Sequence, residues 1–181
     1  DLQSNSIARE HRLQIEKDLM RTFPDHHRYQ HEQAEGIAAL RRVLSAYAYF
    51  NPKLGYCQSM NFIAALMLLF MSEEDAFWIL VVTVEKILPG EYYNQMTGVK
   101  TDISAFCTLL QSKLPKVWTH MENVGLDRQT LEGAVLPWFL CLFIKHLPLE
   151  STLRFFDSFF SEGDKVLFRV GLALFKLFAK Q

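Results

Sequence analysis

The chain lacks an excess of positive charge and a paired set of cysteines. Its 181 residues carry a formal net charge of −1, which argues against a nucleic-acid binder that relies on a broad basic face. The three cysteines, Cys57, Cys107 and Cys141, are odd in number and widely spaced, with no C-x-x-C pair. We interpret them as reduced thiols of a cytosolic protein, with Cys107 and Cys141 as small core hydrophobes.

Long hydrophobic runs are also missing. The apolar runs at 62–71 and 134–144 are shorter than the roughly 20 residues that cross a bilayer as a helix. No basic and apolar leader of the signal-peptide type opens the chain. We therefore expect a cytoplasmic domain without a transmembrane anchor of its own.

Strand signals are nearly absent, because the only β-branched cluster, at 81–84, lies inside a helical pattern. Half of the residues are apolar and 13% are aromatic, which indicates a packed globule. Apolar residues recur at steps of three and four through most of the chain, and no solenoid-type repeat is evident. We predict one all-α domain over residues 1–181, with about eight to ten helices.

Prolines and capping residues delimit the predicted helices. The first helix ends before Pro24 and the second at Asn51-Pro52. Ser72 is expected to cap the fourth helix and Asp102 the fifth. The ranges predicted from the third helix onward are 58–71, 73–88, 102–114, 134–146, 149–160 and 165–179.

Arg21 lies at the end of the first predicted helix, three residues after Asp18. A cation is favoured there by the helix dipole, and Asp18 can hydrogen-bond it, which would be a purely structural role. Alternatively, Asp18 positions a planar guanidinium that can donate several hydrogen bonds to phosphate oxygens. The local pattern leaves both roles open.

Gln58 follows a turn at Gly55 and precedes an apolar helix. A glutamine near a helix start can satisfy free backbone N–H groups, which is again a structural role. However, Gly55 indicates a tight turn or a close backbone approach. A polar amide at the exposed end of a rigidly anchored helix is also well placed to serve as a catalytic group.

Together, the segments 15–24 and 51–61 resemble the TBC domain, a family of GTPase-activating proteins for Rab GTPases. The resemblance rests on Ile15-x-x-Asp18-x-x-Arg21 followed by Tyr56-x-Gln58. Two later segments, 138–143 and 157–163, are also similar to the family, so that the resemblance runs from about residue 15 to the C-terminus.

The chain departs from the family pattern in two places. The family usually carries a glycine after the glutamine, where this chain has Ser59. A small side chain still fits, but a positive φ at Ser59 would be unexpected for a serine. An early arginine-containing segment of the family is not recognisable in residues 1–12. We therefore expect a domain that is truncated at the N-terminus and the C-terminus.

The resemblance implies a mechanism with two fingers. Arg21 would enter the GTPase site and neutralise charge that develops on the phosphoryl oxygens. Gln58 would replace the glutamine of the GTPase in orienting the attacking water, with Asp18, Tyr56 and Cys57 as supporting or partner-binding residues. An arginine supplied in trans accelerates GTP hydrolysis by about 10³–10⁵-fold.

The resemblance also implies the partner and the setting. The chain would be an activator without turnover of its own, acting on a GTP-bound Rab that carries GTP and Mg²⁺. It would need no cofactor and would bind no nucleic acid. We expect a monomeric, cytoplasmic domain that is recruited peripherally to membranes in membrane trafficking, through the Rab or through flanking domains.

Two other functions are compatible with the same sequence. One is a non-catalytic Rab-binding or scaffold module on the same fold, and the other is a helical interaction domain unrelated to GTPases. The presence of both Arg21 and Gln58 favours an activator, because a scaffold needs neither side chain. A metal site drawn from His26, His27, His31 and Glu35 is weakly supported, since histidines four apart more often lie on a solvated surface.

Overall fold

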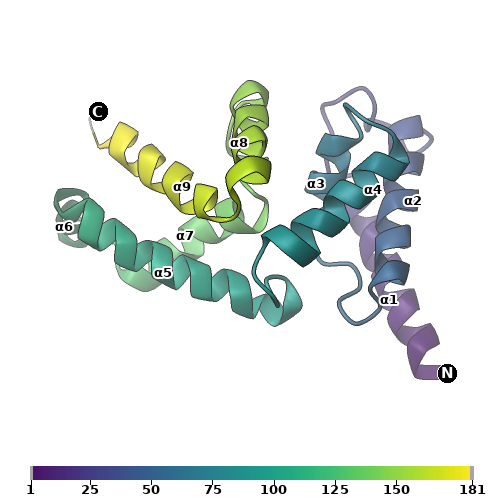
Figure 1. The fold of residues 1–181 in the computed structure, drawn as a ribbon, viewed down its shortest axis with the longest axis horizontal. Coiled ribbons are helices and arrows are strands. Elements are labelled where there is room, and N and C mark those ends of the chain that lie inside the picture. Colours follow the sequence, from purple (N-terminus) through teal and green to yellow (C-terminus); the bar gives the residue numbers. More distant parts are fainter. Residues whose placement is uncertain (1, 180–181) are drawn as a thin grey trace. The chain divides into compact units, whose positions relative to one another are not determined.

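The computed structural model describes the backbone of residues 2–179 and the side chains of residues 9–179. Within this part of the chain there are nine α-helices and no strand (Figure 1), which confirms the all-α prediction. Tertiary contacts divide the chain into two compact units, Asp1–Lys86 and Ile87–Gln181. None of the helices in the described part is both long and apolar enough to cross a membrane.

The first unit contains four α-helices (Figure 1). They are α1 (Leu2–Leu19), α2 (Glu35–Phe50), α3 (Met60–Met67) and α4 (Glu73–Val82). The helix α2 packs against each of the other three, and α3 is buried along its whole length. This burial agrees with the apolar sequence of α3, because a helix that is apolar on all sides belongs inside a core.

Two boundaries in this unit depend on backbone conformation. The third helix begins at Met60 and not at Gln58, because Ser59 adopts a left-handed conformation with φ 90° that a right-handed helix cannot include. The Ser72 hydroxyl accepts a hydrogen bond from the Asp75 N–H, so the predicted cap is confirmed. After α4 the chain continues as a π-helical turn, η1 (Thr83–Ile87).

The second unit contains a short 3₁₀ turn and the remaining helices. They are η2 (Asn94–Met96), α5 (Thr97–Lys113), α6 (Pro115–Asn123), α7 (Arg128–Leu140), α8 (Leu149–Glu162) and α9 (Lys165–Phe178). The helix α5 packs against α6 and α7, and α8 packs against α9. Buried aromatic rings, among them Phe106, Phe139 and Phe143, fill this core together with Cys107 and Cys141, whose predicted core positions are confirmed.

The prediction that Asp102 caps a helix is wrong, because Asp102 lies inside α5. The helix begins earlier because the preceding loop satisfies its first amides. The Gly98 N–H donates to the Glu91 carbonyl and the Val99 N–H to the Tyr92 carbonyl. A sequence pattern centred on capping side chains does not detect a cap made of backbone carbonyls.

The helix α6 is absent from the prediction, which treated Pro115 as the end of the preceding helix. Pro115 instead occupies the first turn of α6. Proline is favoured there because the first helical N–H groups have no partner within the helix. Leu114, between the two helices, is both the C-cap of α5 and the N-cap of α6.

The predicted range 134–146 is wrong at both ends for α7. The Asp127 carboxylate caps the helix by accepting from the Thr130 N–H at 2.7 Å. At the other end, the hydroxyls of Tyr92 and Tyr93 donate to the carbonyls of Phe139 and Leu140 at 3.0 and 3.1 Å. These tertiary hydrogen bonds satisfy the last carbonyls and allow the helix to end at Leu140.

Candidate functional site

The carboxylate of Asp18 joins the two segments in which the candidate residues lie. Asp18 stands in the last turn of α1 and has no solvent exposure. Its Oδ1 forms an ion pair with Arg21, and its Oδ2 accepts a hydrogen bond from the Tyr56 hydroxyl at 2.6 Å. The Gln14 amide lies 3.4 Å from both carboxylate oxygens. A buried carboxylate needs such partners, because an unpaired buried charge is strongly destabilising.

Arg21 lies in the turn that follows α1, so the sequence placed it correctly near the end of this helix. Its side chain remains 53% exposed, although Asp18 beside it is fully buried. The ion pair therefore holds the guanidinium at the surface without covering it. A guanidinium has five N–H donors, so donors remain for an anionic ligand.

The turn before Gln58 is tight, as the sequence predicted. Gly55 has φ 64°, and a Cβ atom at this position would lie only 1.9 Å from the His11 ring. The same ring accepts a hydrogen bond through Nδ1 from the Tyr56 N–H at 3.2 Å. Glycine is therefore required at position 55 both for the left-handed backbone and for the approach of α1.

A second anchor lies at the start of this turn. The Asn51 side chain donates to Glu85 Oε1 at 2.8 Å and accepts from the Leu54 N–H at 3.2 Å. The Tyr47 hydroxyl donates to the same Glu85 oxygen at 2.5 Å. Through these bonds, η1 fixes the beginning of the turn that carries Tyr56.

Gln58 is exposed, and the peptide that follows it is held inside the protein. Ser59 is buried, with the positive φ that a serine rarely adopts. Its N–H donates to Asn61 Oδ1 at 3.1 Å, and its hydroxyl donates to the Gln58 carbonyl. Both the carbonyl and the N–H of the peptide group between Gln58 and Ser59 are thus hydrogen-bonded, which fixes the backbone from which the Gln58 side chain projects.

The two remaining candidates, Tyr56 and Cys57, are neutral groups. Burial, together with the hydrogen bond to Asp18, raises the pKa of Tyr56 far above its usual value, so its hydroxyl remains a donor. Burial also raises the pKa of the Cys57 thiol to about 11. Since a thiolate is the reactive form, this thiol is unsuited to nucleophilic chemistry at neutral pH.

Comparison with known proteins now identifies the family. The sequence profile described as "Rab-GTPase-TBC domain" matches residues 1–181. The chain belongs to the Rab-GTPase-TBC domain family. Its fold is also that of a solved structure, the Chlamydomonas flagellar RabGAP TBC domain, with a TM-score of 0.82 and 37% identity over 98% of this chain and 60% of that chain.

Two mouse proteins are close relatives of this TBC domain. Carabin is 43% identical over 166 residues, which make up 90% of this chain and 36% of carabin. TBC1 domain family member 2B is 42% identical over 164 residues, which make up 90% of this chain and 17% of that protein. The chain thus spans well under half the length of these curated relatives.

The segment that follows Arg21 in this TBC domain is attached to α3. Phe23 packs against Phe62 with ring centroids 6.0 Å apart. Further along, the Tyr29 hydroxyl donates to the Ala65 carbonyl at 2.8 Å, and Arg28 donates to the Leu68 carbonyl at 2.9 Å. The backbone around Arg21 is therefore held between α1 and α3.

The hydrogen bonds that hold these segments in the TBC domain also involve residues that the sequence did not mark as functional candidates, namely His11, Gln14, Thr22, Asn51 and Asn61. Asn61 is the one with a visible signal, because it is a lone polar residue in the apolar sequence of α3. A buried asparagine in such a helix needs hydrogen-bond partners. The partners themselves, however, come from elements that are distant in the sequence.

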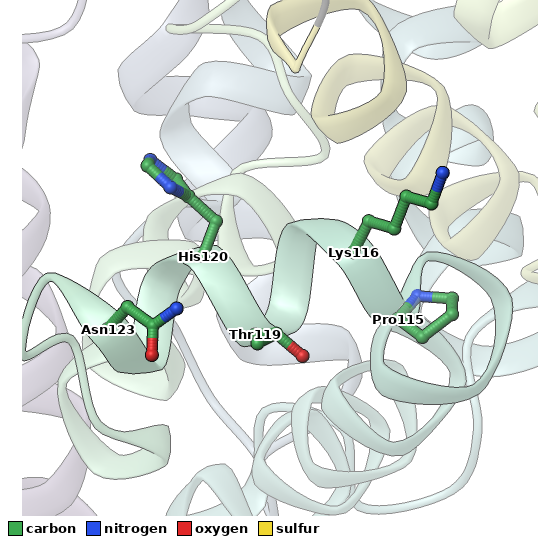
Figure 2. A pocket seen from close by; sticks show the side chains of 5 residues that line it. All are labelled: Pro115, Lys116, Thr119, His120 and Asn123. Atoms are coloured by element: carbon green, nitrogen blue, oxygen red, sulfur yellow. The ribbon is translucent and has the colours of Figure 1, made fainter.

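Other candidate sites offer little chemistry. His26 and His27 stack with ring centroids 4.5 Å apart. No group of three or more His, Cys, Asp or Glu side chains among the described residues is arranged to hold a metal ion. A hollow of about 380 Å³ lies along α6 (Figure 2), and the described residues that line it, from Pro115 to Asn123, all belong to this one helix. A hollow built from one exposed helix face lacks the enclosing walls typical of a ligand pocket.

Proposed function

We propose that this TBC domain accelerates GTP hydrolysis by Rab-type small GTPases through Arg21 and Gln58, both supplied in trans. The observation that carries the proposal is the contact of one buried carboxylate, Asp18, with both Arg21 and Tyr56. This contact brings the two segments of the family pattern to one place. Family membership supports the choice of a Rab as the partner.

Arg21 acts as the arginine finger. Its half-exposed guanidinium enters the nucleotide site of the Rab and donates hydrogen bonds to the phosphoryl oxygens as negative charge develops there. The ion pair with Asp18 fixes the orientation of the planar group before the Rab binds. A donor that is already oriented needs little reorganisation at the moment of reaction.

Gln58 acts as the glutamine finger. Its exposed amide has both a carbonyl acceptor and an N–H₂ donor. It can therefore accept a hydrogen bond from the attacking water and donate one to a phosphoryl oxygen. Tyr56 and Cys57, just before it, contribute backbone groups that contact the switch region of the Rab.

The Rab brings GTP and Mg²⁺, so the domain itself supplies only side chains and surface. We propose that it acts as a monomer on the GTP-bound Rab. Because Rab proteins work on membranes, we further propose cytoplasmic localisation with peripheral recruitment, through the Rab or through flanking domains.

Single-turnover phosphate release from a panel of GTP-loaded Rab proteins tests this function. The wild-type chain should accelerate release by at least one member of the panel. Arg21→Ala and Arg21→Lys should both lose about 10³-fold or more of this stimulation, since lysine keeps the charge but not the planar fork. Unchanged stimulation by folded Arg21→Ala would remove Arg21 from the mechanism.

A binding measurement separates an activator from a non-catalytic Rab-binding module. The chain should bind a Rab that carries GDP, Mg²⁺ and a planar γ-phosphate mimic much more tightly than the same Rab with GDP alone. Equal affinity for the two forms, together with no stimulation across the panel, would favour the scaffold function.

A further inference from the structure

The residues that directly follow the two fingers are joined inside the first unit. Thr22 follows Arg21, Ser59 follows Gln58, and Asn61 lies between them in space. The Asn61 amide donates to Thr22 Oγ1 at 2.9 Å and accepts from the Ser59 N–H at 3.1 Å. All three residues are only 1% exposed.

This chain of hydrogen bonds continues to α1. The Thr22 hydroxyl donates to the carbonyl of Asp18 at 2.6 Å, and the carboxylate of Asp18 pairs with Arg21. Each residue in the series is therefore hydrogen-bonded or ion-paired to the residue that comes next in it. Hydrogen-bonded networks of this kind, buried away from water, rigidify the surrounding structure when every member is satisfied.

The peptide group between Gln58 and Ser59 lies at the other end of the series. Asn61 holds its N–H, and the Ser59 hydroxyl holds its carbonyl. The left-handed conformation of Ser59 is one that a serine adopts only when its surroundings enforce it. The direction in which Gln58 leaves the surface therefore depends on Asn61, and through Asn61 on Thr22.

We propose that Thr22, Asn61 and the Ser59 backbone form a relay that fixes the position of Gln58 relative to Arg21. The proposal rests on the function proposed above and adds positioning residues to the same site. Thr22 and Asn61 do not touch the nucleotide. They act by holding Gln58 close to one geometry, and a small displacement of a catalytic group can slow a reaction by about 10²-fold.

Thr22→Val tests the relay, because valine keeps the shape of threonine and removes the hydroxyl. We expect about 10-fold slower single-turnover hydrolysis at saturating concentrations of the chain, with the affinity for the Rab changed less than about threefold. Thr22→Ser, which keeps the hydroxyl, should restore the rate. Loss of affinity without loss of rate would contradict the relay.

Thr152→Val in α8 is a matched control. Thr152 is also 1% exposed, and its hydroxyl donates to the Pro148 carbonyl at 3.1 Å, outside the relay. The control variant should be destabilised to a similar degree and keep the wild-type rate. If both variants slow the reaction equally, the effect is general destabilisation and the relay is wrong.

A double-mutant cycle then asks whether Thr22 acts through Gln58. If the relay is correct, the loss of hydrolysis rate caused by Gln58→Ala should be about 10-fold smaller in the Thr22→Val background, because the valine substitution has already displaced Gln58. A double variant whose loss of rate equals the product of the two single-variant losses would overturn the relay.

Amide hydrogen exchange of Ser59 in the free chain tests the relay without a Rab. Protection of the Ser59 N–H should fall in Thr22→Val and be unchanged in Thr152→Val. Unchanged protection in Thr22→Val would reject the relay whatever the activity. A wild-type chain that stimulates no Rab would reject the proposed function, while the exchange result would still decide the relay.

Discussion

The Tyr56 hydroxyl donates a 2.6 Å hydrogen bond to Asp18, across a separation of 38 residues in the sequence. Asp18 is also the partner of Arg21, and Tyr56 is two residues from Gln58. This one bond therefore links α1 to the turn before α3. It explains how side chains on two separate segments can act together.

Tyr56→Phe should weaken both stability and GTPase stimulation. The change removes the donor and leaves Asp18 Oδ2 without this partner, so we expect a loss of about 1–3 kcal/mol in the free energy of unfolding. Tyr92→Phe is the control, because its hydroxyl also donates to a buried acceptor, the Phe139 carbonyl, but lies in the second unit. Chemical denaturation should show a stability loss for both variants, and single-turnover hydrolysis should show a loss of stimulation only for Tyr56→Phe. Full activity of Tyr56→Phe would contradict the positioning role.

Gln58 should rescue a Rab that lacks its own switch glutamine. If Gln58 replaces that residue, a Rab with alanine there is still stimulated substantially by the wild-type chain, and Gln58→Ala abolishes the rescue. Gln58→Glu should also fail, because a carboxylate lacks the amide donor and brings negative charge next to the phosphates.

Phosphate release from the four pairings of wild-type or alanine-substituted Rab with the wild-type or Gln58→Ala chain gives the answer. If the wild-type chain does not stimulate phosphate release from the alanine-substituted Rab, a glutamine finger is excluded. Gln58 would then have a structural role at the turn before α3.

Ser59→Gly should stabilise the protein by about 1 kcal/mol, because glycine adopts a left-handed conformation without the steric cost that a Cβ atom imposes. Stimulation should fall by no more than about threefold, since the bond from the hydroxyl to the Gln58 carbonyl is lost but the N–H that Asn61 holds is retained. Ser59→Ala keeps the steric cost and loses the hydroxyl, so it should be less stable than wild type. Urea denaturation of the three proteins checks this order, and a destabilised glycine variant would contradict it.

Asp102→Asn should stabilise the protein at neutral pH but not in acid. Burial, with a smaller contribution from Asp164, raises the pKa of Asp102 from 3.8 to about 6, and its buried Oδ2 has no hydrogen-bond partner among the described residues. The folded state therefore binds the proton more tightly than the unfolded state. Stability falls as the pH rises from about 4 to about 6, and stays lowered above that range.

Thermal melts at pH 7.5 and pH 4 measure this effect. The Asn variant should melt higher than wild type at pH 7.5, and the difference should shrink toward pH 4, where Asp102 is protonated. Asp157→Asn is the control, because this carboxylate is 71% exposed and should change the melting temperature little at either pH. An equal gain for Asp102→Asn at both pH values would contradict a role for its ionisation.

The sequence by itself determined the fold class, and it singled out Arg21 and Gln58 as the proposed finger residues. Periodic apolar residues predicted helices because a helix buries one face at a spacing of 3–4 residues, and Ser72 marked a helix start through a purely local bond. The pattern around Arg21 and Gln58 was recognisable because its spacing is local within each segment.

Only the tertiary structure decided where several helices begin and end and how the site is held together. Tyrosine hydroxyls end α7 at Leu140, and loop carbonyls allow α5 to begin at Thr97. Likewise, Asp18 meets Tyr56, and Thr22 meets Asn61, only after α1 and α3 pack together. Except for the loop carbonyls at the start of α5, these bonds join groups that are 38 to 47 residues apart, so their formation depends on packing and not on any local propensity.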